Sequence, residues 1–252
     1  MEPILEVSNL SKTFHTEHQG DFTAVDRVSF QLFPGQTLGI VGESGSGKST
    51  LAKLLCRLTD PTEGTVRLCG RDITRARGKE LTDAYRTMQM VFQDPMGSFD
   101  PRRTLGDGIG ESLRNAGVSK AETAKRVQLL LDQCGLPGDF SNRYPYEVSG
   151  GQCQRAAIAR ALAIEPRLLI CDEATSALDV TVQQQIMELL TRLRQEKDMS
   201  YLFICHNLAL VQNFCDRLLV MYRGKIVESG TPDQVIFHPQ SDYTKLLIDS
   251  IL

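Results

Sequence analysis

A glycine-rich loop between an apolar run and a helical run constrains this chain more than any other feature. The segment from Gly42 to Ser49 matches the pattern G-x-x-x-x-G-K-[ST] at every fixed position. It follows the apolar run 38–41, which we expect to be a strand, and precedes the run 48–58, which we expect to be a helix. Inward-pointing N–H groups and the helix N-terminus favour a polyphosphate. The alternative is a glycine-rich connector that binds nothing.

Two pairs of side chains supply the chemistry that such a loop needs. Lys48 is expected to neutralise phosphate charge, and the Ser49 hydroxyl to bind Mg²⁺. The apolar run 168–171 ends at Asp172 and Glu173, and ligands of open α/β sheets bind at this end of a strand. Asp172 suits a Mg²⁺ site, and Glu173 is placed to orient or deprotonate a water molecule. Alternatively, both carboxylates cap the helix that follows.

Strand-like and helix-like patterns alternate along most of the sequence and predict an α/β fold with a largely parallel sheet. The N-terminal third is predicted to begin with β-strands. Residues from about 96 to 154 are instead predicted to form an inserted helical subdomain. A turn at Arg223-Gly224 predicts a closing hairpin. The remaining runs expected to be strands are 4–7, 28–32, 201–205 and 218–222.

The clearest amphipathic helix is expected over 119–135. Ser119 and Glu122 have the spacing of a capping box, and Gly135 is suited to end the helix. The side chains predicted to form its buried face are Ala124, Val127, Leu130, Leu131 and Cys134.

Composition narrows the class of protein. The 252 residues include 28 Lys and Arg against 31 Asp and Glu, which gives a net charge of −3. The sequence has no dense block of basic residues, so nucleic-acid binding is disfavoured. No apolar run approaches the roughly 18 residues that span a bilayer, so we expect no membrane crossing. The seven cysteines form no C-x-x-C pair, and several lie in apolar runs, which predicts buried, reduced thiols in a reducing compartment.

A second glycine pair opens a helix in the middle of the chain. Ser149-Gly150-Gly151-Gln152 precedes the helical run 156–163, so a hydroxyl and bare backbone donors again lie at a helix start. Alone, the pair is ordinary for a helix entry. The pair lies between the glycine-rich loop from Gly42 to Ser49, called the phosphate loop below, and Asp172. In this order of motifs the sequence resembles the ATP-binding-cassette (ABC) ATPase family, and these four residues resemble that family's signature motif.

The resemblance covers nearly the whole chain and assigns roles to further residues. Gln93 is similar to the family's Q-loop glutamine, which contacts Mg²⁺, and His206 to its switch histidine, so Glu173 and His206 are expected to be catalytic. Ser176 and Asp179 fall in the segment that resembles the D-loop, which communicates across a dimer. The resemblance places Phe14 as an aromatic that stacks on adenine, although it is equally suited to be a core residue. The residues expected to bind nucleotide are Phe14, Gly42, Glu43, Ser44, Gly45, Ser46, Gly47, Lys48, Ser49, Thr50, Gln93, Ser149, Gly150, Gly151 and Gln152, and those expected to bind Mg²⁺ are Ser49, Gln93 and Asp172.

The family implies a fold and a mode of action. The expected fold is a single ABC ATPase domain over 1–252: a P-loop NTPase, RecA-like core with an N-terminal antiparallel β subdomain and an inserted α-helical signature subdomain. Two such domains are expected to face head to tail and enclose ATP and Mg²⁺ between them, and hydrolysis separates the pair.

Finer features resemble one subfamily, the oligopeptide, dipeptide and nickel importers. Residues 94–102 are similar to its Q-loop extension and 238–247 to its C-terminal motif. The implied partners are a second ABC ATPase subunit, preferably a different chain, two transmembrane permease subunits and an extracytoplasmic substrate-binding protein, with no nucleic acid. The implied location is peripheral, on the cytoplasmic face of the inner membrane.

Some points stay open at this level. No cysteine-bearing extension follows the C-terminal motif, which leans towards nickel or metallophore cargo over peptides. A soluble ABC ATPase not coupled to a permease and a scaffold that does not hydrolyse ATP are the alternatives. Cys205 and Asn207 flank His206 where the family commonly has Thr and Asp, and loss of that carboxylate is expected to weaken communication across the dimer.

Overall fold

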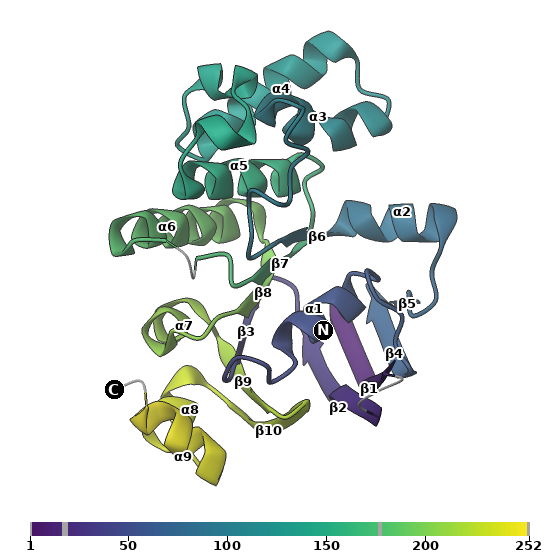
Figure 1. Cartoon of the computed structure of the whole chain (residues 1–252), viewed down its shortest axis with the longest axis vertical. Helices are drawn as coiled ribbons and strands as arrows, with labels where there is room; N and C mark the ends of the chain where they lie inside the picture. Colours follow the sequence, from purple (N-terminus) through teal and green to yellow (C-terminus); the bar gives the residue numbers. More distant parts are fainter. Residues whose placement is uncertain (1, 17–19, 176–177, 251–252) are drawn as a thin grey trace.

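Two β-sheets and a group of helices form the chain (Figure 1), which the computed structural model describes over residues 2–16, 20–175 and 178–250. The strands are β1 (Leu5–Thr16), β2 (Gly20–Leu32), β3 (Thr37–Val41), β4 (Glu63–Leu68), β5 (Arg71–Asp72), β6 (Met88–Val91), β7 (Leu168–Asp172), β8 (Ser200–Ile204), β9 (Arg217–Tyr222) and β10 (Lys225–Gly230). The helices are α1 (Lys48–Leu55), α2 (Gly78–Thr87), α3 (Leu105–Asn115), α4 (Lys120–Gln133), the 3₁₀ turns η1 (Gly138–Asn142) and η2 (Pro145–Glu147), α5 (Gly150–Leu162), α6 (Val180–Lys197), α7 (Leu208–Phe214), α8 (Pro232–Phe237) and α9 (Asp242–Asp249).

The two sheets differ in strand direction. The four-stranded sheet has the order β2-β1-β4-β5 and is antiparallel. The six-stranded sheet has the order β10-β9-β3-β8-β7-β6, in which only β10 runs antiparallel to its neighbour. The prediction of a parallel α/β core with an N-terminal antiparallel β part is therefore confirmed.

Both faces of the parallel sheet are buried, which explains why its strands are continuous apolar runs. Successive side chains of a strand point to opposite faces, and the structure separates them accordingly. Leu168 and Ile170 of β7 pack with α1 and the antiparallel sheet, whereas Leu169 and Cys171 pack on the other face with the helical part. Two hydrophobic clusters thus share one sheet, and α1 lies between the two sheets (Figure 1).

Helices α3, α4 and α5 gather at one end of the molecule, beyond the six-stranded sheet (Figure 1). Their apolar residues belong to the same cluster as one face of that sheet. Ser119 caps α4 by accepting from the N–H of Glu122 at 3.3 Å, as its spacing predicted, but the Glu122 carboxylate pairs with Arg126. The predicted buried face of α4 is wrong at Ala124, which is exposed, because Thr123 packs inward there instead.

Two turn predictions have different outcomes. The hairpin at Arg223-Gly224 is confirmed: both residues have positive φ, at 44° and 81°, and join β9 to β10 in the two-residue turn that favours such angles. The helix expected over 48–58 ends early, at Leu55. The chain leaves it because Arg57 adopts a left-handed conformation with φ of 57°, and its guanidinium bonds to Asp60 at 2.5 Å.

Two further expectations concern the membrane and the cysteines. Within the described ranges, no helix has both the length and the apolar character needed to cross a bilayer. All seven cysteines are free thiols, and all except Cys69 are buried. Burial raises the pKa of Cys56 and of Cys171 to about 12.

We expect thiol reagents near pH 8 to label Cys69 rapidly in the native protein and the other cysteines only after unfolding. The buried thiols stay protonated and out of contact with water, and the thiolate is the reactive form. Peptide mapping by mass spectrometry after a short exposure checks this, and Cys69→Ser should remove the fast label. Rapid native labelling of Cys56 or Cys171 would contradict the packing described above.

Candidate functional site

The glycine-rich loop lies between β3 and α1 and is held tightly by two neighbouring strands. Gly47 has φ of 105°, and a Cβ atom on it would lie 2.2 Å from the carbonyl oxygen of Ala24 in β2. A Cβ on Gly42, whose φ is 152°, would lie 2.2 Å from the carbonyl oxygen of Met221 in β9. These positions therefore require glycine, because the strands leave no room for a side chain.

The ammonium group of Lys48 points back into this loop. It donates to the carbonyl oxygens of Gly42 and Glu43, both at 2.8 Å, and only 4% of the residue is exposed. Burial lowers the pKa of Lys48, and the negative charges of Glu173 and Asp172 oppose that shift. A cation held this way inside a ring of backbone groups suits a phosphate chain.

A hydrogen bond connects the start of α1 to the end of β7. The Ser49 hydroxyl donates to Oδ1 of Asp172 at 3.0 Å, and Asp172 is buried. Burial raises the pKa of the Asp172 carboxyl, and the bond from Ser49 opposes the shift. A hydroxyl and a carboxylate oxygen from separate segments thus lie together, and both are hard oxygen ligands of the kind that Mg²⁺ takes.

Glu173 is the point where three predicted residues meet. The Gln93 side-chain amide donates to Oε2 of Glu173 at 2.7 Å, and Nδ1 of His206 lies 3.9 Å from the same oxygen. Glu173 has a left-handed φ of 49°, and its N–H donates to the carbonyl oxygen of Ile204 in β8. This bond fixes the turn after β7, which aims the carboxylate towards the loop side of the sheet.

A cavity of about 280 Å³ lies over the loop. Eight of the predicted site residues line it, together with Phe22 of β2 in place of Phe14. Phe14 and Phe22 are a directly opposed pair on β1 and β2, with exposed fractions of 39% and 60%. Sequence reasoning missed Phe22, although an aromatic in a strand that reaches the loop was the available signal. The lining residues are Phe22, Ala24, Ser44, Gly45, Gly47, Lys48, Ser49, Thr50, Gln93 and Glu173.

The signature segment does not reach this cavity within the chain. Ser149 caps α5: its Oγ accepts from the N–H of Gln152, and the Gln152 side chain accepts from the N–H of Ser149 at 2.9 Å. Asp179 likewise caps α6 by accepting from the N–H of Val182. Neither helix start lines the cavity over the loop. Ser176, the other residue expected to communicate across a dimer, lies outside the described residues.

A residue near the C-terminus contacts the loop. The hydroxyl of Tyr243 in α9 accepts from the backbone N–H of Glu43 at 3.0 Å, and its ring stacks on Tyr222 with 4.0 Å between centroids. The sequence placed Tyr243 in a C-terminal motif without linking it to the loop. The contact joins residues that lie far apart in the chain, so no local pattern reveals it.

Asn207, where a carboxylate is common in the family, has a structural role. Its Oδ1 accepts from the N–H groups of Ala209 at 3.0 Å and Leu210 at 3.3 Å, so it caps α7 as an aspartate does. The Cys205 sulfur accepts from the N–H of Asn207. The turn that carries His206 is therefore held by both flanking residues.

Comparisons with known proteins agree with this geometry. A family model described as "ABC transporter" matches residues 25–176. The oligopeptide transport ATP-binding protein OppF of Salmonella typhimurium is 46% identical over 90% of this chain and 69% of its own length. OppF of Bacillus subtilis is 45% identical over 99% of this chain and 83% of its own length.

Solved structures give the same result. The dimeric ATP-binding cassette MJ0796, in a post-hydrolysis state bound to ADP and Pi, matches with a TM-score of 0.84 at 30% identity and covers 90% of this chain and 98% of its own. CbiO1 from Clostridium perfringens, part of the transporter complex cbiONQ, matches with a TM-score of 0.81 at 27% identity, over 94% of this chain and 92% of its own. By its loop geometry and these similarities, the chain belongs to the ABC transporter family and is an ATPase of that family.

Proposed function

We propose that this chain is the ATP-binding and hydrolysing subunit of a multi-subunit importer that takes up peptides. The observation that carries the proposal is the meeting of Gln93, Glu173 and His206 at the edge of the phosphate loop. Both sequence relatives described above are oligopeptide transport proteins by name. This favours peptides over the nickel or metallophore cargo suggested by the sequence alone.

The loop and its neighbours bind the nucleotide in this proposal. Backbone N–H groups of the loop and the Lys48 ammonium hold the phosphates, while Ser49, Gln93 and Asp172 hold Mg²⁺. The donor set fits this ion, because the Ser49 hydroxyl already lies 3.0 Å from a buried Asp172 oxygen. Bound there, Mg²⁺ neutralises phosphate charge.

Glu173 and His206 act on the attacking water and the terminal phosphate. Glu173 accepts a proton from water, and the amide of Gln93 holds its carboxylate in place at 2.7 Å. His206 lies on the same side, 3.9 Å from that carboxylate, with about half of its side chain exposed. It is therefore open to a phosphate group that enters from solvent.

A second ATPase subunit completes the site. Ser149 and Asp179 cap helix starts that do not line the cavity over this chain's own loop. A partner cassette facing head to tail therefore brings its equivalent helix start to the nucleotide. We prefer a heterodimer to a homodimer, as the subfamily resemblance suggests. Hydrolysis removes a charge that bridges the two surfaces, and the pair opens.

The proposed assembly places the chain on the cytoplasmic face of the inner membrane, in contact with two permease subunits. A substrate-binding protein delivers the substrate to these permease subunits. The segment 94–102 is the proposed permease contact. Arg160 in α5 stabilises this segment by donating to the carbonyl oxygen of Ser98 and lying over the Phe99 ring.

In this proposal the chain is one domain, 1–252. Residues 96–154 form its helical subdomain, and residues 238–247 form its C-terminal motif. A soluble ABC ATPase without a permease is the alternative.

We expect Glu173→Gln to bind ATP with normal affinity and to accumulate a closed dimer with its partner subunit. Its ATPase rate should fall at least 100-fold, because a general base typically contributes a factor of ~10²–10⁴. Phosphate release and size-exclusion chromatography measure both effects. Lys48→Ala is the matched control, because it should lose ATP binding and the closed dimer together.

The same variants test the transport assignment in cells. Glu173→Gln should abolish uptake of a labelled short peptide and leave nickel uptake unchanged. Loss of nickel uptake alone would contradict the peptide assignment. Loss of neither, with the ATPase rate still reduced, would favour the alternative without a permease.

We expect Phe22→Ala to weaken ATP binding more than Phe14→Ala does, because Phe22 lines the cavity over the loop. Loss of one aromatic–base stack costs about 1–3 kcal/mol. Calorimetric titration with ATP measures this, and inorganic tripolyphosphate, which has no base, should bind all three proteins equally. A larger effect of Phe14→Ala would instead assign adenine stacking to Phe14, as the family resemblance does.

We expect Tyr243→Phe to raise the KM for ATP about fivefold with little change in kcat, which corresponds to the loss of one hydrogen bond of ~1 kcal/mol. The variant removes the acceptor for the Glu43 N–H and keeps the ring stacked on Tyr222. Steady-state ATPase kinetics check this. Tyr222→Phe is the control, and an equal effect there would show that the hydroxyl of Tyr243 is unimportant.

A further inference from the structure

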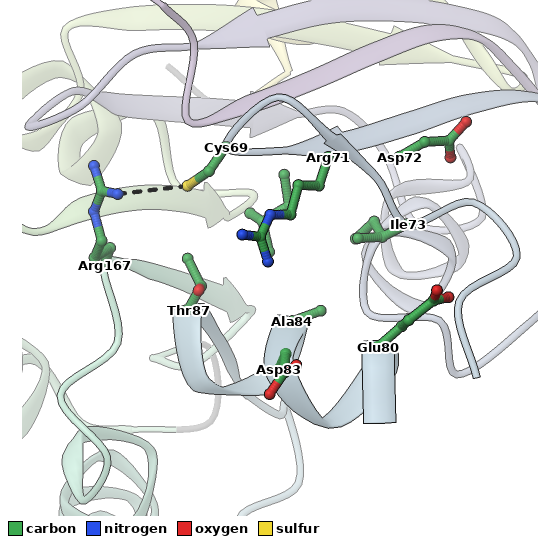
Figure 2. Close-up of a pocket in the computed structure, with 10 residues that line it drawn as sticks. Cys69, Arg71, Asp72, Ile73, Glu80, Asp83, Ala84, Thr87 and Arg167 are labelled. Atoms are coloured by element: carbon green, nitrogen blue, oxygen red, sulfur yellow. Dashed lines mark hydrogen bonds between the residues drawn. The ribbon is translucent and has the colours of Figure 1, made fainter. Parts of the chain in front are cut away.

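A larger cavity, of about 510 Å³, lies away from the phosphate loop, between the β4–β5 hairpin and α2 (Figure 2). Arg167, which immediately precedes β7, also lines its wall. A volume of this size is within the range of about 300–1,000 Å³ that small-molecule sites occupy. Its apolar base is formed by buried residues, namely Leu68, Ile73 and Ala84.

One end of the cavity is basic. The Arg71 side chain extends into it, on the same side as Cys69, Thr87 and Arg167 (Figure 2). Within the described part of the chain, the Arg71 guanidinium makes no hydrogen bond or ion pair. Arg167 donates to the Cys69 sulfur at 3.6 Å, and sulfur is a weak acceptor. Both guanidinium groups thus keep donors available.

The other lining charges are acidic. Glu80 and Asp83 lie three residues apart on α2 and therefore on one face of that helix. Asp83 lies 3.7 Å from Arg86, and Asp72 accepts from the N–H of Thr74, so these two already have partners. No ion pair among the described residues connects Arg71 or Arg167 to any of the three carboxylates that line the same cavity.

We propose that this cavity binds a small zwitterion with a short apolar body, such as an amino acid or a very short peptide. Its carboxylate pairs with Arg71 and Arg167, because planar guanidinium groups match carboxylates. Its ammonium group pairs with Glu80, the lining carboxylate that has no ion pair or hydrogen bond among the described residues. Opposite charges that share a cavity without contacting each other are both satisfied by one ligand that carries both signs.

The site is separate from the proposed nucleotide site and connected to it by two strands. Thr87 and Arg167 immediately precede β6 and β7, whereas Gln93 and Glu173 follow the other ends of these strands. Six residues separate Arg167 from Glu173, so at about 3.3 Å per residue the two sites lie roughly 20 Å apart along the sheet. The Arg167 N–H donates to the carbonyl oxygen of Thr87 at 2.8 Å, so the cavity wall joins the entries to both strands.

The test uses the intact chain saturated with ADP and Mg²⁺. Dialanine, n-butyrate and n-butylamine are titrated separately into this sample. The amide resonances of Gly70, Arg71 and Thr87, measured by NMR, report binding. Dialanine should shift these resonances saturably and slow the labelling of Cys69. Butyrate and butylamine, which carry one charge each, should bind about tenfold more weakly, as expected for the loss of one charged contact.

Variants assign each end of the ligand. Arg71→Gln and Glu80→Gln should each weaken dialanine binding about tenfold. Arg75→Gln and Glu63→Gln remove the same charges from exposed positions outside the cavity and should leave binding unchanged. Butyrate that binds as tightly as dialanine would overturn the role of the acidic end. No shift with dialanine, or equal weakening in the control variants, would overturn the site. Gly45 resonances, which report ADP, keep this result independent of nucleotide binding.

Discussion

The parallel register of β3, β8 and β7 is the constraint on which the candidate site depends. Ile40 pairs with Ile204, and Ile204 pairs with Asp172, so three strands end at one level. The N–H of Glu173 and the N–H of Cys205 continue this pairing across the sheet into the turns. The loop, the acidic pair and the histidine therefore emerge together, although they are widely separated in the chain.

Charge burial explains the arrangement around Lys48. An ammonium group inside the protein needs acceptors or counter-charges, since its desolvation is costly. Two loop carbonyl oxygens contact it directly, and Glu173 and Asp172 offset part of the effect of burial on its pKa. Asp172 is buried as well and accepts from Ser49. The site thus contains one cation beside two carboxylates, and the excess negative charge suits the Mg²⁺ of the proposed function.

Hydrogen bonding distinguishes the segments that contact the phosphate loop within this chain from those that do not. Each of the helix starts at Ser149 and Asp179 has its own capping bonds, and neither lines the cavity over the phosphate loop. Tyr243, in contrast, brings the C-terminal helix onto the loop through the N–H of Glu43. The chain provides the loop side of the candidate site and supports it through α9, which agrees with the proposed role of a second subunit.

The sequence by itself determined the class of fold and predicted the residues of the candidate site. The spacing from Gly42 to Ser49, the acidic pair after β7 and the Arg223-Gly224 turn were readable because each depends on local backbone geometry. Only the tertiary structure decided which aromatic lines the cavity, that Gln93 holds Glu173, and that Tyr243 reaches the loop. It also exposed Ala124 and ended α1 at Leu55. These features arise from contacts between distant segments, and no local pattern encodes strand register or helix packing.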